Sequence, residues 1–111
     1  MKINSKYLHS YVGKLSISEA SYLLSKSYVL VTNDSGLMHI ASAVGVPTLG
    51  LFGPSLENRY APRGSNAYYI RTKKTFNQLT GEKNFDWNTK KNLMNSLSVN
   101  SVFKKIKEIL K

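Results

Sequence analysis

Apolar residues along the chain first recur with helical spacing after position 16. Ser16-Ile-Ser-Glu19 has the form of a capping box, in which the Ser16 hydroxyl and the Glu19 carboxylate satisfy backbone amides at a helix start. The apolar positions that follow share one helical face: Ile17, Ala20, Leu23 and Leu24. The pattern predicts a helix over 17–26, while residues 1–15 give only weak signals of a short strand or an ordered lead-in.

Two short apolar runs then follow, with one helical segment between them. Residues 28–31 are apolar without polar alternation, which predicts a strand covered on both faces, as in a parallel sheet. Residues 37–44 are apolar almost all round, and we expect Asp34 as the N-cap of this helix and Gly45 as its left-handed C-cap. Residues 48–52 predict a second strand, which completes a βαβ unit with parallel strands.

The rest of the chain is less regular until its end. Residues 53–66 are rich in Gly and Pro and are predicted to form a loop, and residues 67–70 predict a third strand. Periodicity is poor over 71–97. The chain closes with a helix capped by Ser98, in which one face carries Val99, Val102, Phe103, Ile106, Ile109 and Leu110.

Composition narrows the class of protein. The chain has 111 residues, which suits one small domain. No apolar run approaches the roughly 20 residues that span a bilayer, and the N-terminal residues lack the apolar core of a signal peptide. The absence of cysteine excludes disulfides, thiolate catalysis and cysteine-bound zinc. The expected location is therefore the cytoplasm.

The balance of charge favours anionic partners. Sixteen Lys and Arg against six Asp and Glu give a net charge of +10, which suits phosphorylated small molecules, nucleic acid or a phospholipid surface. Seven of the basic residues lie near Phe76, Phe85 and Trp87, whose rings could stack bases: Arg71, Lys73, Lys74, Lys83, Lys90, Lys91 and Lys104. Because no recognised nucleic-acid motif accompanies them, a solvated lysine-rich surface is the preferred interpretation, and nucleic acid is not the expected partner.

The candidate chemistry is concentrated in Asp34, Ser35, Gly36 and His39. A hydrolase triad is disfavoured, because Asp34 precedes the helix without a route to the far nitrogen of His39 and no G-x-S-x-G motif exposes the serine. A second interpretation is an anion cradle, since a helix that starts directly after a parallel strand offers unpaired amides to a phosphate. A third is structural: Asp34 caps the helix, Gly36 is required for packing, and His39 is a core histidine bonded to a carbonyl.

A longer motif favours the cradle. Asn33-Asp-Ser-Gly-Leu-Met-His-Ile-Ala-Ser-Ala43 is followed by Gly45-Val-Pro47 and then by Leu51-Phe-Gly-Pro-Ser55. This order resembles the signature of glycosyltransferase family 9, the bacterial lipopolysaccharide heptosyltransferases. The segments 13–19 and 94–110 resemble the flanks of that signature, whereas 71–93 has no match.

The resemblance implies a two-domain glycosyltransferase of the GT-B type, whose C-terminal Rossmann-like domain holds an ADP-heptose-like donor. Residues 1–111 would form a single partial domain of that half, a three-layer α/β unit with a short parallel sheet and a C-terminal helix. The donor-binding residues carried over, around the diphosphate and the sugar, are Asp34, Ser35, Gly36 and His39. Gly53, Pro54 and Ser55 would line the same crevice, although a plain turn explains them equally well.

The resemblance also implies what this chain lacks. The family's catalytic base belongs to an N-terminal acceptor domain that we expect to be absent here, so we predict no catalytic residue and doubt that the isolated chain transfers sugar. No metal or cofactor is expected beside the nucleotide-sugar substrate. We interpret the chain as a C-terminal fragment of a heptosyltransferase-like enzyme of lipopolysaccharide core biosynthesis. The alternative is a non-catalytic nucleotide-sugar-binding or interaction module that pairs with a partner chain or a second copy. Attachment to the anionic inner face of the bacterial inner membrane is left open.

Overall fold

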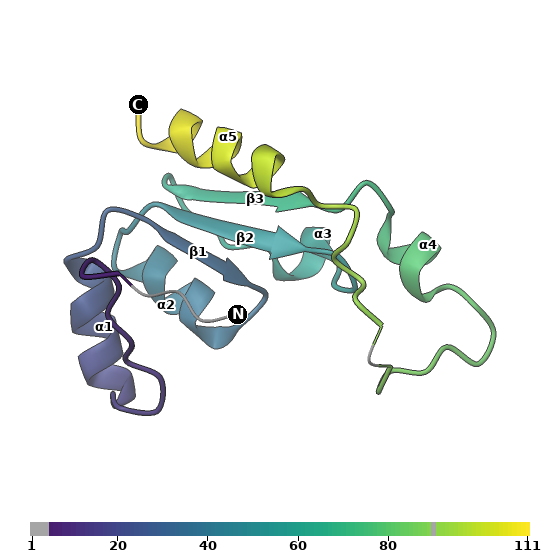
Figure 1. Cartoon of the computed structure of the whole chain (residues 1–111), viewed down its shortest axis with the longest axis horizontal. Coiled ribbons are helices and arrows are strands. Elements are labelled where there is room, and N and C mark those ends of the chain that lie inside the picture. The colour runs from purple at the N-terminus through teal and green to yellow at the C-terminus, as the bar shows by residue number, and fades with distance from the viewer. Residues whose placement is uncertain (1–4, 90) are drawn as a thin grey trace.

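The chain folds around a parallel sheet of three strands with helices on both of its faces (Figure 1). The computed structural model describes residues 5–89 and 91–111. In chain order the elements are α1 (Ile17–Ser25), β1 (Leu30–Asn33), α2 (Gly36–Ala43), β2 (Thr48–Phe52), α3 (Glu57–Tyr60), β3 (Ala67–Arg71), α4 (Phe76–Thr80) and α5 (Val99–Ile109).

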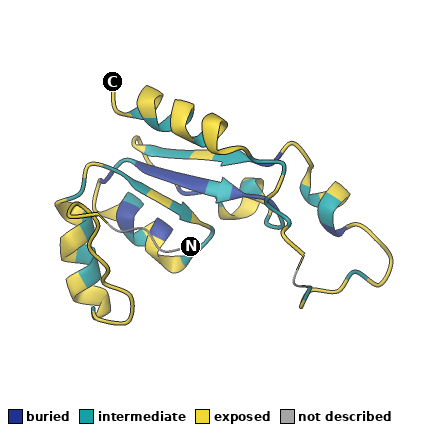
Figure 2. Ribbon diagram, in the orientation of Figure 1, coloured by how far each residue is buried: buried dark blue, intermediate teal, exposed yellow. Residues whose placement is uncertain are grey.

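The strands lie in the order β1, β2, β3, and every pairing is parallel. Val31 pairs with Leu49, which in turn pairs with Tyr68. The central strand β2 is the best buried, with Thr48, Leu49, Gly50 and Phe52 shielded from solvent (Figure 2). The predicted βαβ unit and third strand are confirmed, and the molecule is a partial Rossmann-like α/β unit.

The two faces of the sheet are covered by different helices. A Cβ added to Gly50 would lie 2.7 Å from the Sδ of Met38, so α2 packs directly on this face of β2. Leu51 points to the opposite face, where it lines a groove of about 450 Å³ with residues of α5 such as Phe103. The three layers are therefore α2, the sheet and α5. The buried apolar residues lie in α2, in β2 and in the link between them (Figure 2): Met38, Ala41, Val46, Leu49 and Phe52.

Local capping signals set the start of α1 and the end of α2 as the sequence predicts. The Glu19 amide donates to the Ser16 hydroxyl at 3.1 Å, and the Ser16 amide donates to the Glu19 carboxylate at 3.0 Å. At the end of α2, Gly45 adopts a φ of +87°, and the Val46 amide donates to the Ala41 carbonyl at 3.1 Å. This is the Schellman arrangement that a C-cap glycine permits. These expectations are confirmed.

The first strand differs from its prediction. It begins at Leu30, where the ladder opens with a hydrogen bond from the Leu30 amide to the Pro47 carbonyl at 2.9 Å. Tyr28 is 88% exposed. The expectation that this strand is covered on both faces is also wrong, because β1 is an edge strand whose alternate residues Val31 and Asn33 are exposed.

Two short helices lie where the sequence predicts loop or gives no regular pattern. The predicted loop 53–66 contains α3, and the unassigned stretch 71–97 contains α4. Their four and five residues are too few for hydrophobic periodicity to appear. The lead-in from residue 5 to residue 16 holds no strand, whereas α5 forms as predicted behind the N-cap Ser98. Across the ranges that the structure describes, no helix has the length and apolar character needed to cross a membrane.

Candidate functional site

The residues singled out by the sequence meet at the junction of β1 and α2. Asn33 ends β1, Asp34 and Ser35 form the link, and Gly36 is the first residue of α2. In open parallel α/β sheets, ligands bind beside the carboxyl ends of the strands, which is the end at which this link lies. The fold therefore places the cluster at the edge of the sheet where a ligand is expected.

Ser35, rather than Asp34, is the N-cap of α2. Its backbone is extended, with φ −160° and ψ 166°, and no cap bond to its side chain is present among the described residues. Its hydroxyl instead lies 3.3 Å from the hydroxyl of Thr32 in β1, and the two groups share a hydrogen bond. The prediction that Asp34 caps the helix is wrong, because the extended residue that precedes the first helical turn is Ser35. The half-buried Asp34 stands one position further out.

Gly36 is in open space. A Cβ built on this residue would meet no atom within 4 Å, and the residue is exposed. The alternative in which Gly36 is required for packing is therefore wrong. Because the first amides of a helix have no intrahelical partner, an exposed glycine at this position leaves them accessible.

His39 lies on the outside of α2. It is exposed, whereas its neighbour Met38 is fully buried against the sheet. The alternative of a core histidine is therefore also wrong. His39 follows Ser35 by four residues, so both lie on the same side of the first helical turn. No hydrogen bond joins Asp34, Ser35 and His39 in the described residues, and the Ser35 hydroxyl faces Thr32 instead of a catalytic base.

The loop after β2 borders the same edge of the sheet. Asn33 and Leu51 are register partners, so the carboxyl ends of β1 and β2 are adjacent. Gly53 is buried, and a Cβ there would lie 2.6 Å from the Sδ of Met94. Pro54 and Ser55 are half-buried. Gly53 thus has a packing role, and contact of 53–55 with a ligand stays a prediction.

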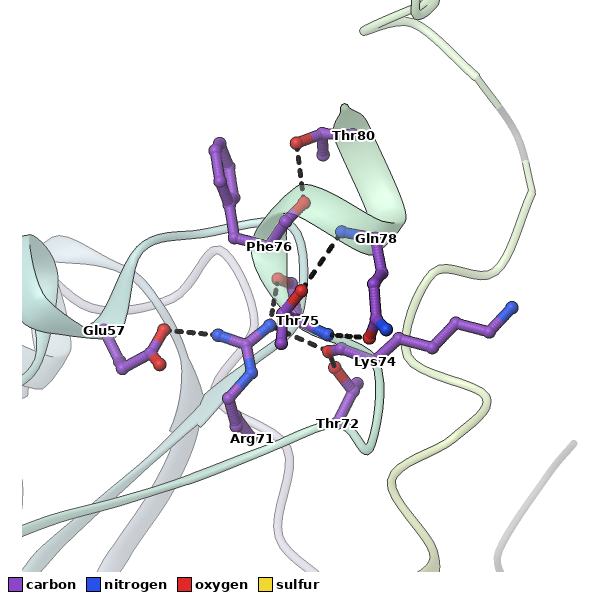
Figure 3. A network of polar contacts seen from close by, with 9 residues as sticks. Glu57, Arg71, Thr72, Lys74, Thr75, Phe76, Gln78 and Thr80 are labelled. Atoms are coloured by element: carbon purple, nitrogen blue, oxygen red, sulfur yellow. Dashed lines mark hydrogen bonds and ion pairs between the residues drawn. The ribbon is translucent and has the colours of Figure 1, made fainter. Parts of the chain in front are cut away.

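One polar cluster has no counterpart in the sequence prediction. Arg71, at the end of β3, forms an ion pair with Glu57 of α3 and donates Nη2 to the carbonyls of Gly53 and Lys74, at 2.9 and 3.0 Å (Figure 3). Its side chain is only 17% exposed. The interpretation of Arg71 as one of several solvated basic residues is wrong, because its charge is used to join the loops after β2 and β3. The partners are separated in sequence by 14 residues or more except for Lys74, so no local pattern marks them.

The groups present at the junction indicate which kind of ligand it could hold. Within 5–89 and 91–111, no three His, Cys, Asp or Glu side chains are grouped so that they could hold a metal ion. The groups offered at the β1–α2 junction are backbone amides, a hydroxyl, an imidazole and one carboxylate. Such a set suits an organic anion with hydroxyl groups better than a cation.

The fold is that of a partial Rossmann-like α/β unit, in which an exposed helix N-terminus directly follows a parallel strand. The sequence model of glycosyltransferase family 9 (heptosyltransferase) matches residues 5–87, which include every residue of the junction. The chain belongs to this family.

Individual relatives of the chain are also named as heptosyltransferases. The chain is 44% identical over 59 residues to lipooligosaccharide heptosyltransferase 2 of Haemophilus influenzae, and 39% identical over 59 residues to lipopolysaccharide heptosyltransferase 2 of Escherichia coli. Each match covers 53% of this chain and 17% of the relative. The lipopolysaccharide core heptosyltransferase OpsX of Haemophilus influenzae is 30% identical over 105 residues, which are 87% of this chain and 30% of the relative. The chain thus spans less than a third of these relatives, and no solved structure matches it.

Proposed function

We propose that this chain binds the diphosphate and sugar of an ADP-heptose-like nucleotide-sugar donor at the junction of β1 and α2. The observation that carries the proposal is the start of α2, an eight-residue helix without a side-chain cap from any described residue, directly after a parallel strand. Unpaired amides and the positive end of the helix dipole favour a bound anion. Membership of a heptosyltransferase family supports a nucleotide sugar as that anion.

Different residues of the junction would contact different parts of the donor. The amides from Gly36 onward and the Ser35 hydroxyl would donate to diphosphate oxygens, and the exposed Gly36 lets the diphosphate approach the backbone. His39, one turn further on, would donate to a phosphate or sugar oxygen. Asp34 would repel a phosphate, so its proposed partners are sugar hydroxyl groups. This division suits a sugar diphosphate better than a bare phosphate.

The proposal assigns donor binding to this chain and no bond-breaking step. Helix-terminal amides can stabilise the charge that develops on a departing nucleotide diphosphate, which is an electrostatic task. Glycosyl transfer also needs a group that takes the proton of the acceptor hydroxyl, and we give none of these residues that role. We therefore expect binding without turnover in an assay with ADP-heptose and a lipid A core acceptor. Clear turnover by these 111 residues alone would overturn this division of roles.

Calorimetric titration with ADP-heptose tests the binding proposal, and the chain offers a matched pair of variants. Its two histidines, His9 and His39, are both exposed. We expect His39→Ala to weaken binding about tenfold, because a hydrogen bond to a charged group contributes about 1.5 kcal/mol or more. His9→Ala, which lies outside the junction, should leave the affinity unchanged. An equal effect of the two variants, or none from His39→Ala, would contradict the assignment.

The second candidate is a non-catalytic module that pairs with another chain or a second copy along β1. Within the described residues β1 pairs only with β2, so its other edge presents free amides and carbonyls. Val31 on this strand is 36% exposed. Sedimentation velocity at several concentrations tests pairing between copies, with Val31→Lys as the variant that should abolish it. A chain that stays monomeric at every concentration would rule out that pairing.

A further inference from the structure

We propose that residues 74–89 and 91–93 form a second small-molecule site, specific for a phosphorylated sugar. These residues border a solvent-open cavity of about 450 Å³ between α4 and the irregular chain that follows it. Figure 1 shows this part of the chain extending beyond the carboxyl ends of β2 and β3. The described residues that line this cavity do not include Asp34, Ser35, Gly36 or His39, so the proposal does not rest on the function proposed above.

The side chains around this cavity supply both kinds of group that a sugar phosphate requires. Two cations and several hydrogen-bonding groups line it: Lys74, Gln78, Glu82, Asp86, Thr89 and Lys91. The lysines can bind a phosphate, and the carboxylates can accept hydrogen bonds from sugar hydroxyl groups. Two carboxylates disfavour a continuous phosphate backbone, which argues against nucleic acid as the occupant. Figure 3 shows the Lys74 side chain directed away from the Arg71 cluster, so its charge is not used there.

An aromatic platform stands beside the cavity. Trp87 is 67% exposed, and its ring is held by Phe85 in an edge-on contact at 4.9 Å between centroids and by Phe76 at 6.3 Å. A neighbouring hollow of about 420 Å³ is lined by Trp87 and Pro54 and shares Phe85 and Lys91 with the first cavity. The apolar face of a sugar ring can lie on such an exposed indole while its polar substituents reach the side chains around it.

The wall of the cavity is held by its own hydrogen bonds. The Asn88 amide donates to the Asp86 carboxylate at 2.9 Å, and the Lys91 amide donates to the Thr89 hydroxyl at 3.2 Å. The family match ends at Trp87, so Thr89 and Lys91 lie outside the residues that this chain shares with the family model. The site therefore extends past the end of the segment that the family model matches.

The fluorescence of Trp87, the only tryptophan of the chain, reports on this site directly. The full chain is titrated in parallel with mannose 6-phosphate, mannose, inorganic phosphate and AMP. We expect a saturable change with mannose 6-phosphate, and responses at least tenfold weaker with mannose and with phosphate, because each carries only half of the recognised groups. Equal affinity for inorganic phosphate would show a bare anion site, and tighter binding of AMP would show a nucleotide site. Either result overturns the proposal, as does the absence of any response.

Matched lysine variants distinguish binding at this site from a general effect of the positive charge of the chain. Lys91→Gln should weaken mannose 6-phosphate binding about tenfold, the effect of losing one charged hydrogen bond. Lys83→Gln removes the same charge from an exposed residue of the same segment that does not line the cavity, and should leave binding unchanged. Lys74→Gln is the second test, and circular dichroism checks that each variant folds. Equal losses in Lys83→Gln and Lys91→Gln would overturn the proposal. His39→Ala should not affect this titration, so failure here and failure of donor binding at the β1–α2 junction are distinguishable.

Discussion

Replacing Gly36 with alanine separates a glycine kept for packing from one kept for access to a ligand. The added Cβ would meet no atom within 4 Å, so the variant carries no steric cost in the folded chain. Glycine in a helix is less favourable than alanine by about 0.5–1 kcal/mol, mainly through the entropy of the unfolded chain. Because Gly36 is the first residue of α2, we expect the lower part of this range. Gly36→Ala should therefore raise the free energy of unfolding by about 0.5 kcal/mol.

The same methyl group should weaken donor binding. It stands beside the first amides of α2, where the diphosphate is proposed to approach. Loss of one amide–phosphate hydrogen bond corresponds to about 1.5 kcal/mol, or roughly a tenfold weaker affinity. Urea unfolding followed by circular dichroism measures the stability, and calorimetric titration with ADP-heptose measures the affinity. A chain that is more stable and binds more weakly is the expected result. A loss of stability would mean that Gly36 has a packing role, and an unchanged affinity would refute the approach of the diphosphate at this residue.

Three further predictions concern the framework that holds the site. Gly50→Ala should lower the free energy of unfolding by about 1–3 kcal/mol in the same urea assay, because its Cβ would lie within 3 Å of two fully buried side chains. Arg71→Met should cost about 1–3 kcal/mol, since it leaves the Glu57 carboxylate largely buried without its cation, and adding Glu57→Gln should restore part of the loss. Hydrogen bonds from the Ser16 backbone and then its hydroxyl hold the pKa of Glu19 below its ordinary range. The resulting stabilisation is present above the pKa of the unfolded state and is lost as the pH falls through the lower folded-state value, so thermal melts across the acidic range should show a loss that Glu19→Gln removes.

The parts of the fold that follow from the sequence are those specified by neighbouring residues. The capping box of Ser16 and Glu19 and the left-handed Gly45 each act within one helical turn, so the sequence predicts the start of α1 and the end of α2 closely. The burial of a residue, in contrast, depends on parts of the chain that are distant in sequence. The exposure of Val31 depends on where β1 lies in the sheet, and the apolar run that contains it carries no information about strand order.

In the candidate site, too, some features follow from neighbouring residues and others depend on the folded arrangement. The motif around Ser35 and Gly36 leads directly to the helix N-terminus, because strand, link and helix are consecutive in the chain. The choice of N-cap does not follow from propensity, since Asp and Ser are equally good caps and the extended backbone of Ser35 decides between them. The Arg71 cluster joins residues that only the folded sheet brings together, and the sequence therefore gives no signal for it.

The position of the site depends on packing behind it more than on the side chains that it presents. Met38 and His39 are adjacent on α2, yet one is fully buried on β2 and the other is exposed beside the proposed donor site. The absence of a side chain at Gly50 lets Met38 seat the helix against the sheet, and that seating fixes where the first amides of α2 lie. A donor held mainly by backbone amides is held by groups that no substitution at the surface removes. A change at Gly50 should therefore weaken donor binding without touching the donor, through displacement of α2, whereas a change at His39 should weaken it while stability stays unchanged.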